Sequence, residues 1–220
     1  MIDYFSLGHP LSRLRSRYAQ RARERMLRLF LATFQPTPET RVLDLGVTPD
    51  QSLPESNYFE RHYPYPERIV AASIEDISAL QDIFPRTRMV RIAPGPLPFA
   101  DQSFDIVFCS AVLEHVGSRD RQQQFVRELL RVGRAYFLTT PDRWFPVEFH
   151  TLIPLIHWLP QSCHQQILRV LGLEFWSKTD NLNLLTGREL MEIFPPASRP
   201  VLKKITTCGW PSNLVAFGLC

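Results

Sequence analysis

Long apolar runs are missing from this chain of 220 residues. No stretch reaches the roughly 18 apolar residues that span a bilayer, and Met1–Phe5 lacks the basic start and apolar core of a secretory signal. Cysteine is scarce: the four cysteines show neither paired metal-binding spacing nor the density of a disulfide-rich fold. With 45% hydrophobic and 21% charged residues, the composition predicts a globular protein in a reducing, cytoplasmic setting.

Several catalytic and binding signatures are also missing. The sequence contains no P-loop, no serine nucleophile elbow and no CxxC motif. His157 and His164 have no cysteine or acid at ligand spacing, so the local spacing predicts no metal site. The net charge of +3 and the pI of about 8.8 fall short of the strongly basic footprint of nucleic-acid-binding domains. We therefore do not expect a nucleic-acid partner.

Positive charge is nevertheless concentrated in one segment. Residues 12–28 hold seven arginines against one acid, Glu24, and apolar residues recur there at helical spacing. One interpretation is a cationic lid for a phosphate-bearing substrate, or a peripheral contact with a membrane surface. The other, which we favour, is a solvated face on a helix that packs across a sheet. The arginines of that face would be Arg13, Arg17, Arg21 and Arg25.

Five short segments rich in aliphatic and β-branched residues predict strands. They are 41–46, 67–72, 88–92, 104–109 and 135–140. Near-continuous apolar strands are typical of a parallel sheet that helices cover on both faces. Helical patterns over 74–84 and 119–132 separate the strands, which predicts a doubly wound α/β fold. Gly133 is expected at the C′ position of the second helix.

The rest of the chain predicts a cap and a hairpin. Segment 141–180 is crowded with aromatics, prolines and histidines, and it predicts an inserted helical cap with a helix near 161–171. Thr186 and Glu189 have the spacing of a capping box, and two last strands, near 201–207 and 213–217, predict a hairpin that turns through 208–212. We predict one domain over 1–220, composed of a basic N-terminal helix (1–40), a core (41–140), the cap (141–180) and a C-terminal helix and hairpin (181–220).

The segment 97–116, LPFADQSFDIVFCSAVLEHV, resembles the central signature of class I S-adenosylmethionine-dependent methyltransferases. In that family LPF, FD and LEHV flank the fourth strand. The resemblance covers nearly the whole chain and is nearest to methyltransferase type 11-like domains with a degenerate glycine loop. Bacterial members of this subgroup are similar at 57–60 (NYFE) and at 140–151 (TPDRWFPVEFHT). It implies a Rossmann-like sheet of seven strands with a C-terminal antiparallel hairpin, and S-adenosyl-L-methionine as cofactor.

The resemblance also implies where the cofactor would bind, which is between strands one and four. Asp44 and Gly46 match the family's acid and first glycine, while Thr48 and Asp50 stand where further glycines are usual. Ser73 and Ala93 occupy the positions of the acids that usually grip the ribose and lie near the adenine. The candidate cofactor-binding residues are Asp44, Gly46, Thr48, Ser73, Ala93, Ser110, Ala111 and His115.

Methyl transfer to a hydroxyl or an amine needs a general base. The candidates are His115, Glu148 and His150. His115 could instead be a helix-start residue bonded to backbone, and Glu148 could pair with an arginine while His150 caps a following helix. Four aromatic residues could line an acceptor pocket or simply form the core of the cap: Trp144, Phe145, Phe149 and Trp158.

Two functions follow. The favoured one is methyl transfer to oxygen or nitrogen of a small-molecule or carbohydrate-type acceptor, partly apolar or linked to a carrier. Asp44, Gly46 and the LEHV element support it. The alternative is a methyltransferase-like protein without methyl transfer, which serves as a binding or regulatory scaffold or uses the pocket for another ligand. Thr48, Ser73 and Ala93 support that alternative.

Overall fold

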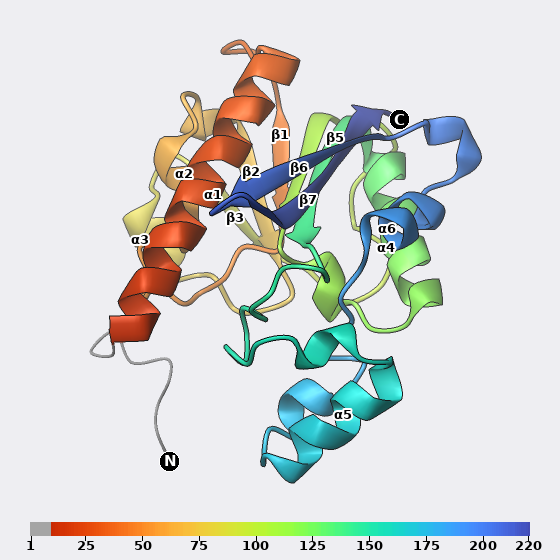
Figure 1. Ribbon diagram of the computed structural model, residues 1–220. Coiled ribbons are helices and arrows are strands. Elements are labelled where there is room, and N and C mark those ends of the chain that lie inside the picture. Colours follow the sequence, from red (N-terminus) through yellow and green to blue (C-terminus); the bar gives the residue numbers. More distant parts are fainter. Residues whose placement is uncertain (1–9) are drawn as a thin grey trace.

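A seven-stranded sheet with helices on both faces forms the centre of the structure, a computed structural model that describes residues 10–220 and their side chains from residue 16 onward (Figure 1). The strands are β1 (Val42–Leu45), β2 (Ile69–Ser73), β3 (Arg88–Arg91), β4 (Phe104–Ser110), β5 (Gly133–Pro141), β6 (Val201–Thr207) and β7 (Trp210–Leu219). The helices are α1 (Pro10–Phe34), α2 (Tyr58–His62), α3 (Leu80–Ile83), α4 (Arg119–Val132), α5 (Gln161–Val170) and α6 (Gly187–Ile193). Short 3-10 turns connect them: η1 (Pro66–Arg68), η2 (Leu113–His115), η3 (Ile156–Trp158), η4 (Phe175–Ser177) and η5 (Pro196–Ser198).

The strand order, β3-β2-β1-β4-β5-β7-β6, confirms the predicted doubly wound sheet with its C-terminal hairpin. The first five strands pair in parallel, and β7 runs antiparallel to both β5 and β6. From β1 the sheet continues to β2 and β3 on one side and to β4 and β5 on the other. The strand order therefore reverses between β1 and β4, which flank the switch point of the sheet. Leu45 lies opposite Cys109 at this point. Open α/β sheets bind their ligands at the carboxyl ends of the strands there.

The two faces of the sheet are packed with different side chains. On the face covered by α4 and α6 the core is largely aliphatic and includes Leu129 and Leu190. On the face covered by α1 and α2 it is aromatic. Phe30 of α1 is fully buried, and its ring makes edge contacts at 5.6 Å with Phe108 and 5.5 Å with Phe137. Such aromatic pairs add about 0.5–1.5 kcal/mol each beyond the area that they bury, and they fix α1 across the sheet.

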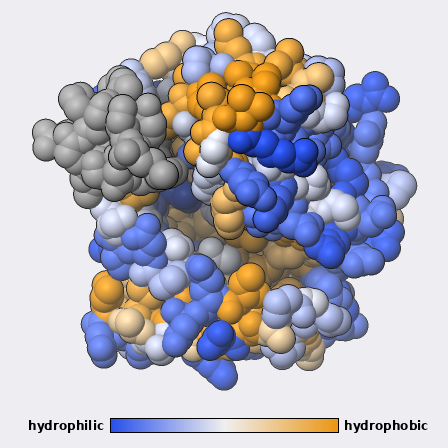
Figure 2. Space-filling model, turned by 90° about the horizontal axis from the view of Figure 1, so that it is seen from below, coloured by the Kyte–Doolittle hydropathy of each residue, from blue (hydrophilic) through white to orange (hydrophobic). Residues whose placement is uncertain are grey.

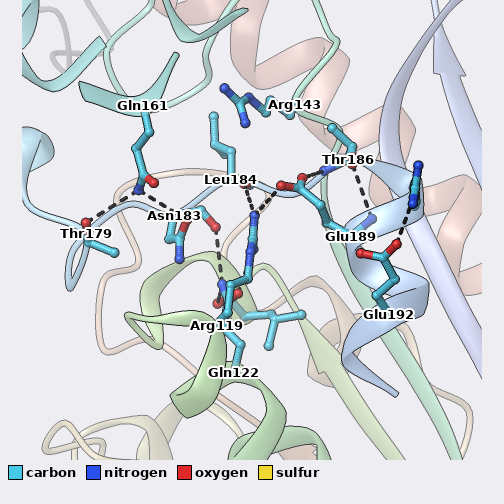
Figure 3. Close-up of polar contacts among 12 residues, drawn as sticks. Arg119, Gln122, Arg143, Gln161, Thr179, Asn183, Leu184, Thr186, Glu189 and Glu192 are labelled. Carbon is cyan, nitrogen blue, oxygen red and sulfur yellow. Dashed lines mark hydrogen bonds and ion pairs between the residues drawn. The ribbon is translucent and has the colours of Figure 1, made fainter. Parts of the chain in front are cut away.

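The cap, residues 141–180, lies beyond the carboxyl end of β5 (Figure 1). It is mostly irregular, with α5 as its α-helix, because its prolines interrupt regular backbone pairing. The return segment 179–186 is tied to the core by polar contacts (Figure 3). Arg119 of α4 pairs with Glu189 at 2.9 Å and donates to the Leu184 carbonyl, while Gln122 donates to the carbonyl of Asn183.

Three local predictions differ from the structure. The helix expected over 74–84 is confined to α3, because Ser73 and Asp76 side chains accept from the backbone N–H of Glu75 and Ser78 and so favour turns. Gly133 is not a left-handed C′ residue: its φ is −101° and it begins β5. A β-carbon there would lie 2.7 Å from Val107 Cγ2, so close packing requires the glycine.

The last hairpin also turns more tightly than expected. Its turn is reduced to Cys208 and Gly209, with φ of 52° and 80°, and two positive φ values are the pattern of a two-residue hairpin loop that matches the twist of the strands. The capping box is present, since Thr186 accepts from the N–H of Glu189 and Glu189 accepts in return. No helix among residues 10–220 is both long and apolar enough to cross a membrane.

Candidate functional site

A cavity of about 330 Å³ opens at the carboxyl ends of β1 and β4, within the range of small-molecule sites. Its walls come from four parts of the chain: one side of α1, the loop 46–60, the ends of β4 and β5, and the start of the cap. Figure 2 views the molecule from the cap side, where apolar groups gather in patches among polar ones and the surface is hollowed between them. The cavity therefore lies at the switch point that the sheet topology defines.

The floor of the cavity depends on a close backbone approach. Gly46 follows β1 with a φ of +99°, and a β-carbon there would lie 2.1 Å from Val112 Cγ2. Its N–H donates to the Ala72 carbonyl at 2.8 Å, which holds the turn against β2. On the other strand, Ala111 also has a positive φ of 57° and donates to the Thr139 carbonyl. The contact with Val112 therefore requires a glycine at position 46.

Acidic side chains dominate the polar lining. The carboxylates are Asp44, Asp50, Glu55, Glu60 and Glu114. Burial raises the pKa of Asp44 well above its ordinary value, and the neighbouring charge and hydrogen bond of Glu60 raise it further. Asp44 therefore keeps its proton at pH values where an exposed aspartate is ionised. Glu60 belongs to α2, so the NYFE element contributes directly to the site.

Arg23 of α1 is the cation that faces these acids in the cavity. Its guanidinium donates to Ser110 Oγ at 3.0 Å, and Ser110 Oγ lies 2.8 Å from Thr139 Oγ1. Burial lowers the pKa of Arg23, and the charges of Glu55, Asp44, Glu114 and Glu60 oppose that effect. A helix that begins far from the sheet in sequence thus delivers the positive charge that balances the acidic wall.

Glu114 lies at the edge where the cavity meets the cap. It is fully buried, and one carboxylate oxygen, Oε2, accepts from Thr140 Oγ1 at 2.9 Å. The other, Oε1, has no hydrogen-bond partner within the part of the chain that the structure describes. His115 follows it in η2, and its Nδ1–H donates to the carbonyl of Asn181 at 2.7 Å. His115 is therefore bonded to backbone, as its alternative interpretation expected, and that bond joins it to the return segment of the cap.

Glu148 and His150 form a tight pair in the loop after β5. Glu148 is 3% exposed and accepts from the His150 ring at 2.6 Å, from the His150 backbone and from Thr151. Burial opposes ionisation of Glu148, but these hydrogen bonds and the charge of His150 outweigh it and lower its pKa to about 2. Within residues 16–220, Glu148 pairs with His150 and Thr151 rather than with the suggested arginine, and the following turn η3 has Leu155 rather than His150 at its N-cap. A permanently ionised carboxylate here orients the imidazole whose ring reaches the cavity wall.

The structure brings some candidate residues together and leaves others apart. Five of them line the cavity: Asp44, Gly46, Thr48, Ser110 and Ala111. Ser73 and Ala93 do not. Ser73 is buried and accepts from the backbone of Glu75, while Ala93 is exposed at the end of β3. Of the candidate bases, His150 lines the cavity, and His115 stands next to it with ring centroids 4.8 Å apart.

The four aromatic residues predicted for the acceptor pocket also divide into one that lines the cavity and three that do not. Phe149 lines the cavity, and its ring stacks on Phe145 at 5.0 Å. Trp158 packs between Trp144 and Trp210 away from the cavity. Of its predicted pocket aromatics, the cap therefore offers Phe149 to a ligand and uses the others for its own packing.

Sequence reasoning missed Arg23, Glu55, Glu60 and Glu114 as parts of the site. A signal for Arg23 was present, because it lies four residues from both Ala19 and Leu27 and so shares the buried side of α1. On the predicted solvated face, the arginines whose side chains the structure describes are exposed: Arg17, Arg21 and Arg25. Arg13 lies outside the described side chains. The solvated-face interpretation therefore fits these three residues, while Arg23, which it did not include, lines the cavity.

The strand order, the antiparallel seventh strand and a cavity at the β1/β4 switch point together define the class I methyltransferase fold. Residues 56–135 match the family described as a methyltransferase domain. An 89-residue segment is 30% identical to the ubiquinone biosynthesis O-methyltransferase of Coxiella burnetii. That segment covers 38% of this chain and 38% of the relative, so the chain spans well under half the length of the curated protein it matches.

Solved structures agree with this fold over nearly the whole chain. The PH0226 protein of Pyrococcus horikoshii is similar with a TM-score of 0.58 and 13% identity, covering 90% of each chain. A possible histamine N-methyltransferase of Thermotoga maritima is similar with a TM-score of 0.56 and 14% identity, covering 94% of this chain and 91% of its own. At these identities the likeness establishes the fold, and the chemistry must come from the site.

Proposed function

We propose that this protein is an S-adenosylmethionine-dependent methyltransferase that acts on oxygen or nitrogen of a small-molecule acceptor, carbohydrate-type or partly apolar. The observation that carries the proposal is the cavity above Gly46, placed at the switch point and lined by opposite charges. The match of residues 56–135 to methyltransferase domains supports it, as does the segment similar to an O-methyltransferase.

The charges in the cavity suit this cofactor. Its methionine end carries an ammonium, a sulfonium and a carboxylate. The acidic wall, which includes Glu60, would hold the cationic groups, and Arg23 would pair with the carboxylate. The cofactor supplies a methyl group already activated for transfer, so the protein mainly binds, aligns and excludes water.

The acceptor side is formed by the start of the cap. Phe149 gives an apolar contact surface and His150 a polar one. Because Glu148 accepts the Nδ1–H of His150, the other ring nitrogen carries the basic lone pair. His150 is therefore the residue that would accept a proton from an acceptor hydroxyl or amine, and Glu148 positions it. Loss of a general base typically lowers kcat by 10²–10⁴, so His150→Gln should reduce kcat far more than it changes KM.

A second function is favoured by one observation, the lack of side-chain ligands where Ser73 and Ala93 end β2 and β3. A chain that no longer grips the nucleoside half of the cofactor could serve as a scaffold or bind another ligand in the same cavity. Binding of the cofactor separates the two functions, because only the first requires it.

The test is calorimetry with S-adenosylmethionine and S-adenosylhomocysteine on wild-type protein, Thr48→Trp and Thr48→Ser. Thr48 is half-buried and lines the cavity, so the indole fills the space while serine keeps the hydroxyl that accepts from Asp50. We expect micromolar binding to wild type and Thr48→Ser, weakened at least tenfold by Thr48→Trp. Absence of binding at millimolar ligand would overturn the proposal and leave the scaffold function.

A further inference from the structure

Three side chains of metal-ligand type meet where the cavity borders the cap. Glu114 and His115 come from η2, and His150 comes from the loop after β5. One ligand atom from each lies within 4.8 Å of the others, and Glu114 Oε1 is 4.0 Å from His115 Nε2. Two imidazoles and a carboxylate form a common ligand set for divalent transition metals.

Both histidines are oriented by a second partner. His115 donates Nδ1–H to the Asn181 carbonyl at 2.7 Å, and His150 donates Nδ1–H to Glu148 at 2.6 Å. Metal-binding histidines almost always donate their other ring N–H to a carbonyl or a carboxylate in this way, which fixes Nε2 as the ligand atom. Trp176 packs against both rings, with centroids at 4.9 Å from His150 and 6.3 Å from His115.

Glu114 gives the strongest indication. Its side chain is fully buried, yet Oε1 has no hydrogen-bond partner among the described residues, while Oε2 accepts from Thr140. A buried carboxylate oxygen without a donor costs free energy that a cation would offset. The surrounding backbone is well held, because Asn183 N–H donates to the Glu114 carbonyl and Gln122 donates to that of Leu113.

We infer that Glu114, His115 and His150 bind a divalent transition metal of the zinc type, through Glu114 Oε1 and the Nε2 atoms of both histidines. A tetrahedral zinc ion with bonds of about 2.0–2.1 Å holds its ligand atoms about 3.4 Å apart, so these atoms must approach by up to about 1.4 Å. Both histidines are only partly buried and can rotate by that amount. Three protein ligands leave a fourth position for water or an acceptor oxygen, on the side where Glu114 and His150 line the cavity.

Binding of the metal does not depend on methyl transfer. If the proposed function holds as well, the cation would lower the pKa of an acceptor hydroxyl bound to it. His150 would then act as a ligand rather than as the proton acceptor. If activity survives complete removal of metal, His150 acts as the general base. If activity requires added metal, His150 acts as a metal ligand.

The test uses full-length protein freed of metal with a chelator, without any cofactor. Titration with Zn²⁺ should show one ion per chain with micromolar or tighter affinity, and His115→Gln and His150→Gln should each weaken it at least tenfold. His62→Gln is the matched control, since this histidine is exposed on α2 and should leave affinity unchanged. Bound Co²⁺ should give visible d–d bands and no thiolate charge-transfer band. The same spectrum is expected after the exposed Cys163, Cys208 and Cys220 are replaced by serine.

The melting temperature provides a second readout. Zn²⁺ should raise it for wild type and for His62→Gln, and not for the two ligand variants. If a ligand variant fails to fold, Thr140→Val takes its place, because it keeps all three ligands and removes the hydroxyl that donates to Glu114 Oε2; loss of an orienting partner typically weakens metal binding by about 10–100-fold. The inference is overturned if binding is absent, if the histidine substitutions change it by less than twofold, or if it disappears with the surface cysteines.

Discussion

The carboxyl edge of the sheet has two unlike halves. The charged half, at the ends of β1, β4 and β5, gathers Arg23, Asp44, Glu114 and the Glu148–His150 pair around the cavity. The bare half, at the ends of β2 and β3, offers Ser73 and Ala93, which line no part of that cavity. Both halves belong to one parallel sheet, so the strands themselves do not cause the difference.

The difference arises from the segments that meet each half. Side chains from α1, the segment 46–60, η2 and the cap converge on the charged half, where Arg23 faces the carboxylates. At the bare half, the side chains of Ser73 and Asp76 accept hydrogen bonds from backbone N–H groups two residues further along the chain. These side chains are therefore used within their own loop. A ligand that spans both halves would gain side-chain contacts mainly from the first and rely on backbone groups and shape in the second.

The largest effect is expected from breaking the Glu148–His150 pair. Because the folded-state pKa of Glu148 is about 2 and its ordinary value is 4.5, its ionised form stabilises the fold above about pH 4.5. That contribution is lost as the pH falls toward 2. Glu148→Gln should therefore lower the free energy of unfolding by about 2–3 kcal/mol at pH 7 and by almost nothing near pH 2. Urea denaturation across this range measures it, and a loss independent of pH would contradict this origin.

A smaller loss is expected when the cation of the charged half is removed. Arg23→Met breaks the bond to Ser110 and leaves the acidic wall without its balancing charge. We expect the free energy of unfolding to fall by about 2 kcal/mol at pH 7. Arg21→Met is the control, because Arg21 is exposed on the same helix and should cost below about 0.5 kcal/mol. Equal losses in the two variants would mean that Arg23 acts only through helix packing.

The smallest effect should come from the bare half. Ser73→Ala removes one hydrogen bond, accepted from the Glu75 N–H at 3.2 Å, and should cost about 0.5–1 kcal/mol of stability. Because Ser73 does not line the cavity, S-adenosylmethionine affinity should change by less than twofold in calorimetry. A tenfold loss of affinity would show that this half does supply a side-chain ligand, and the contrast between the halves would fail.

Much of this architecture could be read from local patterns. The apolar segments at 41–46 and 104–109 predicted the two strands that flank the cavity, and Thr186 with Glu189 predicted the start of α6. Hydrophobic periodicity and helix capping depend on residues a few positions apart, so a short stretch of sequence is enough to predict these elements. The helix expected over 74–84 was wrong because Ser73 and Asp76 compete for the backbone groups, and apolar spacing does not report that competition.

The site was less accessible to such patterns. Asp44, Gly46 and Thr48 were found through the family resemblance, since they lie in and directly after one recognisable strand. Glu114 was passed over within a segment that was otherwise singled out, since nothing local shows that its carboxylate is buried beside Thr140. His115 and His150 are separated by 35 positions, and no ligand spacing joins them until the sheet brings η2 and the cap together.

The sequence by itself determined the strands, the order of helices between them and the glycine at the end of β1, because hydrophobic period, turn chemistry and the absence of a side chain are local properties. Only the tertiary structure decided which charges face one another. Arg23, Glu114 and His150 come from segments that meet solely through packing around the sheet, and electrostatic energies depend on distance and burial, which no local pattern encodes.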